Sequence, residues 1–179
     1  GEASGRMPQS ESRILRNLFR LGTLTARDIM TPQTVITSLP ETASLKQALA
    51  TVSKRPFSRV PVYHNEEDQI TGFVLRDDVL MGNAQGKNAE TLESLRRDIM
   101  KVPATVRLTK LFDTFLQKRQ HIAIVLDEYG STQGLVTLED LVETLIGMEI
   151  IDETDRVVDM RALARKHWAT SPLTFAARS

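Results

Sequence analysis

The 179-residue sequence contains no cysteine and only three histidines. The missing thiols exclude disulfide bonds, thiolate catalysis and zinc sites built on Cys ligands. His64, His121 and His167 are far apart and lack the paired spacing of metal-binding motifs. No Ser, His and Asp residues form an evident catalytic triad. We therefore expect neither an enzyme nor a resident metal site.

A net charge is also missing, because 23 Lys and Arg residues balance 23 Asp and Glu residues. A neutral chain argues against nucleic-acid binding driven by phosphate neutralisation, except through a local basic patch. No apolar run approaches the roughly 20 residues that span a bilayer, and no secretory signal is visible. The segment 1–7 has no periodicity and starts with Gly1. We interpret the chain as a piece of a longer protein.

What the sequence does contain is an internal repeat. The tetrapeptide RDIM occurs at 27–30 and again at 97–100, and each copy precedes an apolar stretch, TVITSL from 34 and ATVRL from 104. A helical pattern, a short β-branched run and a turn-rich segment follow in both copies. One unit of about fifty residues could not bury both faces of its sheet. The predicted fold is therefore α+β, with two β-α-β-β-α units packed about a pseudo-twofold axis.

The repeat predicts matching elements in the two units. Both helices have apolar residues at helical spacing, and both β-branched runs are five residues long. The predicted helix faces are Leu45, Ala48, Leu49 and Val52 in the first unit, and Leu108, Leu111, Phe112, Phe115 and Leu116 in the second. The predicted strands are RVPVY at 59–63 and IAIVL at 122–126.

The chain divides into five parts on this basis. They are an N-terminal connecting segment with a helix (1–23), the first unit (24–84), a linker (85–96), the second unit (97–150) and a C-terminal part (151–179). The N-terminal helix is amphipathic, with Ile14, Leu15, Leu18 and Phe19 on one face. The C-terminal part begins with an acidic turn, continues as a basic amphipathic helix and ends in a tail that we expect to be disordered.

The junctions between the last strand and the last helix of the two units differ at one position of the Thr-x-x-Asp pattern. The second unit has GLVTLED at 134–140, and the first has GFVLRDD at 72–78, so Leu75 replaces Thr137 while an Asp is kept. Thr137 and Asp140 could simply cap the helix that follows. They could equally bind a nucleotide, because a helix N-terminus suits phosphate and a carboxylate can accept from two ribose hydroxyls.

Two such units closed by GLVTLED resemble a pair of cystathionine-β-synthase (CBS) domains, the Bateman module. The segments RDIMTP, SRVPVY, IAIVLDEYG and GLVTLEDLVETLIGMEI further resemble the cytoplasmic CBS pair of the CNNM/CorC family, membrane proteins linked to magnesium and cobalt export. The similarity covers about residues 24 to 153. It implies an upstream transmembrane domain and a position of this fragment on the cytoplasmic side of the cell membrane. Many relatives carry a further C-terminal domain, whereas this chain has only a short helix there.

The resemblance also implies a composite nucleotide site. In CBS pairs the Thr-x-x-Asp junction of one unit faces the opening strand of the other and binds the ribose and phosphate of an adenine nucleotide. The residues implied are Thr137 and Asp140 for ribose and phosphate; Thr31, Val35, Ile36 and Thr37 for the base; Ser58, Arg59, Val60 and Pro61 for the opposite wall; and His121 near the phosphates. Core packing of the apolar members is the structural alternative.

The function that the resemblance implies is regulation of a divalent-cation (Mg/Co) transporter by AMP or ATP, bound with or without Mg²⁺, within a homodimer. Leu75 predicts that the first junction binds weakly or has become structural. A ligand-independent dimerisation module is the main alternative, with Thr137 and Asp140 acting only as caps. Direct Mg²⁺ sensing by the acidic segment 152–155 is a further one, although Mg²⁺ commonly arrives on nucleotide phosphates.

Overall fold

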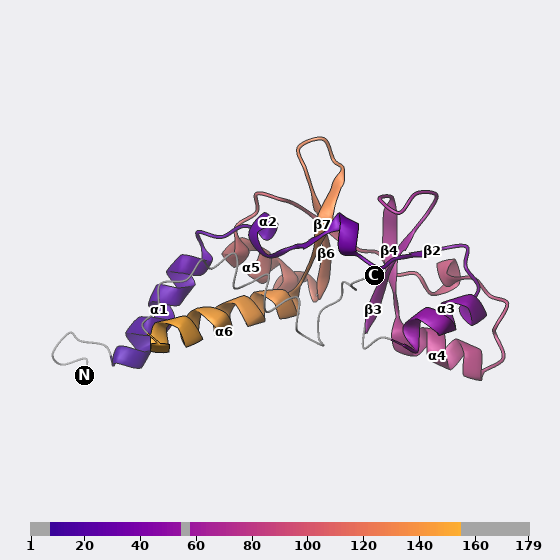
Figure 1. The fold of residues 1–179 in the computed structure, drawn as a ribbon, viewed down its shortest axis with the longest axis horizontal. Coiled ribbons are helices and arrows are strands. Elements are labelled where there is room, and N and C mark those ends of the chain that lie inside the picture. Colours follow the sequence, from indigo (N-terminus) through magenta and orange to yellow (C-terminus); the bar gives the residue numbers. More distant parts are fainter. Residues whose placement is uncertain (1–7, 55–57, 155–179) are drawn as a thin grey trace.

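The computed structural model describes residues 8–54 and 58–154 of the chain, with side chains up to residue 150. It has two lobes, each formed by one β-sheet and the helices packed on its outer face (Figure 1). The two sheets face one another across the middle of the molecule, so the helices lie toward its two ends. This mixed architecture confirms the predicted α+β fold.

The strands form two sheets of similar design. One has the order β2-β3-β4 and the other the order β1-β7-β6-β5. In each, a short parallel strand precedes an antiparallel hairpin, β3-β4 or β6-β7. The strands are β1 (Thr31–Pro32), β2 (Leu39–Pro40), β3 (Arg59–Tyr63), β4 (Ile70–Leu75), β5 (Met100–Pro103), β6 (Ile122–Leu126) and β7 (Thr132–Thr137). Both predicted β-branched strands, 59–63 and 122–126, are confirmed at their predicted bounds.

The helices cover the outer face of each sheet, except for the first one, which packs on two other helices. They are α1 (Gln9–Leu21), α2 (Ala26–Ile29), α3 (Leu45–Val52), α4 (Arg76–Ala84), α5 (Leu108–Lys118) and α6 (Leu138–Thr154), with 3₁₀ turns η2 (Gln33–Val35) and η3 (Leu92–Leu95). The predicted faces of α3 and α5 are largely buried, but Phe112 and Leu116 on α5 are exposed. Helix α6 runs on to Thr154, where the sequence had suggested an acidic turn. The basic helix and tail predicted beyond it lie outside the described residues.

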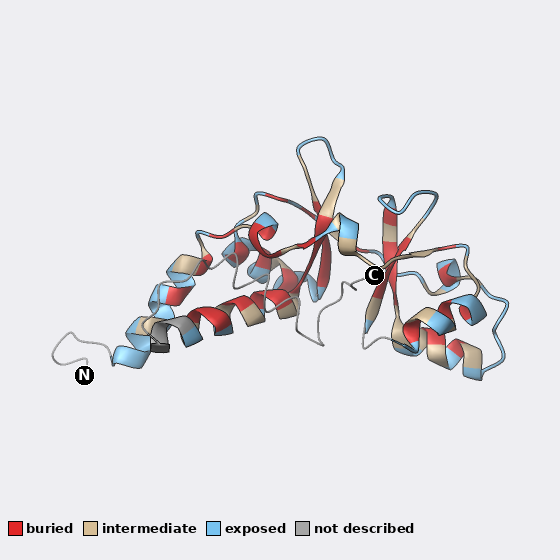
Figure 2. Cartoon of the chain, viewed as in Figure 1, coloured by how far each residue is buried: buried red, intermediate tan, exposed pale blue. Residues whose placement is uncertain are grey.

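Three apolar clusters hold the lobes together. One packs α3 and α4 on the first sheet, around Leu45 and Val79. A second packs α5 and α6 on the second sheet, around Leu111 and Met148. The third joins the facing sheets, with Phe73 from one and Ile124 from the other. Figure 2 shows the buried positions along the sheets and on the inner sides of the helices.

The first strand crosses to the other sheet. β1 pairs with β7 through Thr31–Leu135 and Pro32–Gly134, although the repeat assigns it to the first unit. The approach is so close that a Cβ atom on Gly134 would lie 2.2 Å from the Thr31 carbonyl oxygen. Gly72 meets the Arg97 carbonyl oxygen in the same way, at 2.3 Å. Each unit therefore needs the glycine that begins its junction, because backbone of the opening segment of the other unit occupies the space of a side chain.

The two RDIM copies differ in structure despite their identical sequence. In the first, the Asp28 carboxylate accepts from the backbone N–H of Thr25 at 2.9 Å and starts α2. In the second, the residue three positions before Asp98 is Leu95, which has no hydroxyl to complete such a cap. That copy is extended, and Arg97 exchanges backbone hydrogen bonds with Phe73. Local capping therefore decides the structure of this tetrapeptide.

The opening strand of each predicted β-α-β-β-α unit corresponds to TVITSL or ATVRL, and neither stretch forms that strand over its full length. The first stretch forms η2 and only the short β2, and the second follows β5 instead of forming a strand. The true equivalents are Leu39–Pro40 and Val102–Pro103, because both pair parallel with the first strand of the following hairpin. The first unit thus has an extra segment between RDIM and its parallel strand, and this segment contains β1 and η2.

Helix α1 has its apolar face directed away from the protein. Ile14, Leu15, Leu18 and Phe19 are all exposed, with Phe19 at 79%, whereas Asn17 is 1% exposed. The polar side packs on α6, where Glu149 accepts from Arg13 Nε at 2.5 Å and from Asn17 Nδ2 at 2.8 Å. The predicted amphipathic helix is confirmed, and these two bonds fix which face it exposes.

Candidate functional site

The second junction lies where β7 passes into α6. The backbone N–H of Thr137 donates to Oδ2 of Asp140 at 2.8 Å, and the N–H of Asp140 donates to Oγ1 of Thr137 at 3.1 Å. This reciprocal pair satisfies two donors that a helix start otherwise leaves unpaired. The geometry confirms that both residues cap α6, which was one of the two interpretations of the junction.

Capping does not use all of the Asp140 carboxylate. Its Oδ1 is buried and has no hydrogen-bond partner among the described residues, and Asp140 as a whole is 3% exposed. Burial raises the pKa of Asp140 well above its ordinary value, while the hydrogen bonds from Thr137 act in the opposite direction. A second buried acceptor, Oγ1 of Thr31 on β1, also lacks a hydrogen-bond partner within the part of the chain that the structure describes. Unpaired buried oxygens are costly, so a donor supplied by a ligand would be favourable here.

The first junction is different. Leu75 occupies the position before α4 and makes no side-chain cap. Asp78 instead accepts from Nη2 of Arg97 at 2.9 Å, in a partly exposed ion pair. The first junction thus lacks the Thr hydroxyl, and its Asp78 carboxylate already has an ion-pair partner, Arg97.

The other predicted site residues are spread around the facing sheets. Ile36 packs against the cluster between the sheets, and Val35 and Thr37 beside it are half-buried. Pro61 is buried at the centre of β3, while Ser58 before that strand is exposed. Val60 lies 2% exposed within the first unit's own helix–sheet core, so its side chain faces away from the opposite lobe.

The two predicted basic residues meet at one hollow. It has a volume of about 280 Å³ and lies between residues of both units, with Arg59 and His121 in its lining. His121 is also next to the second junction, since its carbonyl oxygen accepts from the N–H of Leu138 at 2.9 Å. The remaining lining residues were not predicted: Phe73, Leu75, Arg97, Asp98, Arg119 and Gln120. The sequence held a signal for two of them. Arg97 and Arg119 each lie three residues before a strand, β5 or β6, of one of the facing sheets.

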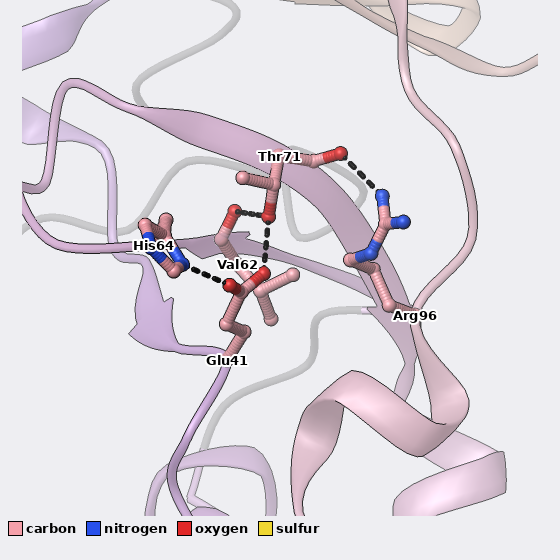
Figure 3. Close-up of polar contacts among 5 residues, drawn as sticks. All are labelled: Glu41, Val62, His64, Thr71 and Arg96. Atoms are coloured by element: carbon pink, nitrogen blue, oxygen red, sulfur yellow. Dashed lines mark hydrogen bonds and ion pairs between the residues drawn. The ribbon is translucent and has the colours of Figure 1, made fainter.

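A separate polar cluster lies at the far end of the first sheet (Figure 3). The buried carboxylate of Glu41 contacts Nδ1 of His64 and accepts from the Thr71 hydroxyl at 2.8 Å. These hydrogen bonds lower the pKa of Glu41, and the bond with His64 has the larger effect. The backbone oxygen of Thr71 accepts from Arg96 at 2.7 Å. Both carboxylate oxygens of Glu41 have partners within the protein, so the cluster stabilises the fold and offers no open site.

The residues with described side chains include no group of His, Asp or Glu that could hold a metal ion. The acidic segment 152–155 lies outside them. None of the helices within residues 8–54 and 58–154 is both long and apolar enough to cross a bilayer.

Comparison with known proteins agrees with this architecture. The family model for the CBS domain matches residues 26–82 and 92–147. The solved CBS domain of a bacterial CNNM/CorC family Mg²⁺ transporter, in complex with ATP, is 33% identical, with a TM-score of 0.72. The alignment covers 99% of that structure and 78% of this chain. The chain belongs to the CBS-domain family and is a CBS pair of the CNNM/CorC type.

Longer relatives share the CBS pair. A UPF0053 protein of Synechocystis is 36% identical over 93% of this chain and 48% of its own length. The magnesium and cobalt efflux protein CorC of Escherichia coli is 32% identical over 89% of this chain and 55% of its own. The chain therefore spans about half the length of these curated relatives.

Proposed function

We propose that this CBS pair binds an adenine nucleotide, AMP or ATP, as a regulatory ligand. The observation that carries the proposal is Oδ1 of Asp140 at the Thr-x-x-Asp junction, a buried acceptor to which no described residue donates. The chain is 33% identical to a CBS domain solved in complex with ATP. A ribose hydroxyl would supply the missing hydrogen bond. The base would lie beside the segment from Thr31 to Thr37 and against 58–61, with the phosphates near His121.

The ligand would act by shifting the arrangement of the two units. Helix α6 begins at the proposed site and is tied to α1 near its other end, through Glu149. A movement at Thr137 would therefore reach the N-terminal helix along one rigid element. We propose that α1 passes it to an upstream transmembrane domain of a Mg/Co transporter, with the CBS pair on the cytoplasmic side of the membrane. The role is regulatory, without catalysis.

We further propose that the pair works as a homodimer. Val142, Ile146 and Ile150 form an exposed stripe on α6, at 44%, 52% and 48% exposure. Residues spaced by four lie on one side of a helix, and such an apolar stripe favours contact with another protein surface. From the sequence alone, apolar residues of the two junction helices are candidates for this contact: Val79, Leu80, Met81, Leu145, Ile146 and Met148. Val79 and Met148 are instead fully buried in the cores, because they face the sheets.

A ligand-independent dimerisation module is the second candidate. The observation that favours it is the reciprocal cap, which gives Thr137 and Asp140 a role without any nucleotide. Calorimetric titration with AMP, ADP and ATP, each with and without Mg²⁺, separates the two candidates. We expect about one strong site per chain, because only the second junction has the Thr. Absence of binding by all three nucleotides would establish the ligand-independent module, and steady phosphate release from ATP would reveal an enzyme.

A further inference from the structure

The exposed side of α1 is an apolar ridge formed by Ile14, Leu15, Leu18 and Phe19. These side chains are between 41% and 79% exposed, and residues three and four apart are neighbours on a helix surface. The ridge faces outward because the polar side of α1 is hydrogen-bonded to Glu149 of α6. The proposed nucleotide site lies at the other end of α6 and gives the ridge no role.

Cations border the ridge toward the C-terminal end of α1. Arg16 is exposed and lies three residues before Phe19, and Arg20 follows one turn after Arg16 on the same side of the helix. A third cation is fixed where α1 ends, since the exposed side chain of Arg107 donates at 3.1 Å to a carbonyl oxygen of the loop that follows α1. Glu11, the one acidic residue of α1, lies in the first turn, at the opposite end of the helix. Apolar surface and positive charge therefore lie side by side.

This combination matches the surface of a membrane that contains acidic lipids. The apolar side chains of an interfacial helix enter the boundary between headgroups and acyl chains, while long arginine side chains extend to the headgroup level. Acidic headgroups attract Lys and Arg residues at that level. Helix α1 also lies at one end of the molecule, beside the far end of α6, where an extended surface can approach it (Figure 1).

We propose that α1 binds the surface of an acidic membrane, with Leu18 and Phe19 inserted and Arg16 and Arg20 among the headgroups. The inference goes beyond the proposed nucleotide binding and does not depend on it. Binding is weak and reversible, because a helix of 13 residues buries few side chains in the interface. A movement that reaches α1 through α6 would then change how the helix lies on the membrane.

Co-sedimentation of the chain with lipid vesicles, in the absence of nucleotide, tests this directly. One set of vesicles contains phosphatidylserine and phosphatidylcholine, and the other contains phosphatidylcholine alone. We expect clear binding to the mixed vesicles at low salt and much weaker binding to phosphatidylcholine. Binding to the mixed vesicles should decrease as salt is raised, because salt screens the attraction between arginines and acidic headgroups.

Three substitutions on α1 should change the binding in opposite directions. Phe19→Ser should weaken partitioning into mixed vesicles about tenfold, since it removes the most exposed apolar side chain of the ridge. Arg16→Gln should weaken it about fivefold, the value of one cation near an acidic surface. Glu11→Gln should strengthen it by roughly the same factor, because it removes a negative charge.

Two matched controls lie away from α1. Tyr129→Ser removes an aromatic side chain that is 85% exposed at a hairpin tip, and Lys46→Gln removes an exposed cation on α3 of the other lobe. Both should bind mixed vesicles as the unaltered chain does. Thermal melts and nucleotide titrations of every variant would establish that the fold and the other site are unchanged.

The inference is overturned if the chain does not bind mixed vesicles, or if Phe19→Ser and Arg16→Gln bind them as well as the unaltered chain. Light scattering distinguishes the other occupant of the ridge, a second copy of the chain. If Phe19→Ser converts dimers to monomers, the ridge is a contact between copies and the membrane assignment is wrong. A failure of nucleotide binding would leave the vesicle result unaffected, so the two proposals stand or fall separately.

Discussion

Thr137 and Asp140 exchange hydrogen bonds across the first turn of α6, and one oxygen of the Asp140 carboxylate receives no hydrogen bond from residues 8–54 and 58–150. The same two side chains can therefore stabilise the helix start and bind a ligand, because each task uses a different oxygen. The first junction cannot do both: Leu75 has no hydroxyl, and Asp78 is paired with Arg97.

The first prediction compares the two junction aspartates. Asp140→Ala should weaken nucleotide binding about 10- to 150-fold, the loss expected for one hydrogen bond to a charged acceptor. Asp78→Ala should weaken it by about threefold at most. Calorimetric titration measures both, after thermal melts show that the variants are folded. Equal losses in the two variants, or no loss in either, would mean that Asp140 serves only as a cap.

The second prediction concerns pH and the buried charge of Asp140. Because burial raises its pKa in the folded protein, the folded state favours the protonated carboxyl. The contribution of Asp140 to the free energy of unfolding is therefore largest below the unfolded pKa of about 4 and falls as pH rises through the raised value. Asp140→Asn removes this ionisation. The stability of this variant relative to the unaltered chain should increase as pH is raised above about 4 in denaturant titrations. A constant difference would contradict the prediction.

The third prediction concerns the Glu41 cluster (Figure 3). Hydrogen bonds from His64 and Thr71 lower the pKa of Glu41, so its stabilising effect is present above the unfolded value and lost as pH falls through the folded one. Glu41→Gln should therefore be less stable than the unaltered chain near pH 7, and the gap should close below about pH 4.5. Urea midpoints measured across this range test it. Thr71→Val deletes one hydrogen bond to Glu41. In this variant the stability should therefore fall less between pH 7 and about pH 4.5 than in the unaltered chain.

The fourth prediction tests the homodimer through α6. Ile146→Lys places a charge in the exposed stripe and should convert dimers to 20.1 kDa monomers at micromolar concentration, measured by light scattering. Tyr129→Lys is the control, because Tyr129 is 85% exposed at a hairpin tip away from the helices. If the unaltered chain is already a monomer, or if both variants stay dimeric, the stripe is not the interface.

The fifth prediction concerns the link between α1 and α6. Glu149→Ala removes the acceptor of both Arg13 and Asn17 and leaves the buried amide of Asn17 without that partner. We expect a loss of about 1–3 kcal/mol in the free energy of unfolding. Hydrogen exchange should accelerate across α1 and leave β6 unchanged. Glu11→Ala, an exposed change in the first turn of α1, should have neither effect.

The fold was predictable where the pattern is local. The strands 59–63 and 122–126 are short, β-branched and bounded by turns, and α3 and α5 have clear helical spacing. RDIM was misleading because its structure depends on Thr25 in one copy and Leu95 in the other. The residue that caps the helix lies outside the matched tetrapeptide, so the match could not predict the difference.

The candidate site was predictable only in part, because it depends on which residues meet across the units. The cap of Thr137 and Asp140 follows from their spacing. The side-chain direction of Val60 depends on which face of β3 meets the helices, and no local pattern fixes that. Arg97 and Arg119 are far from the junction in sequence and reach the hollow only through the packing of the two sheets.

The crossing of β1 to the second sheet has a consequence for synthesis of the chain. β1 is made about a hundred residues before its partner β7. Until β7 appears, the neighbouring apolar residues Leu24, Ala26 and Ile29 lack the core that buries them. Contacts this distant form late, so the nascent chain should not complete the lobes one after another. We expect nascent chains that end before β7 to expose these apolar N-terminal residues. Such chains should depend on chaperones until the second hairpin is made.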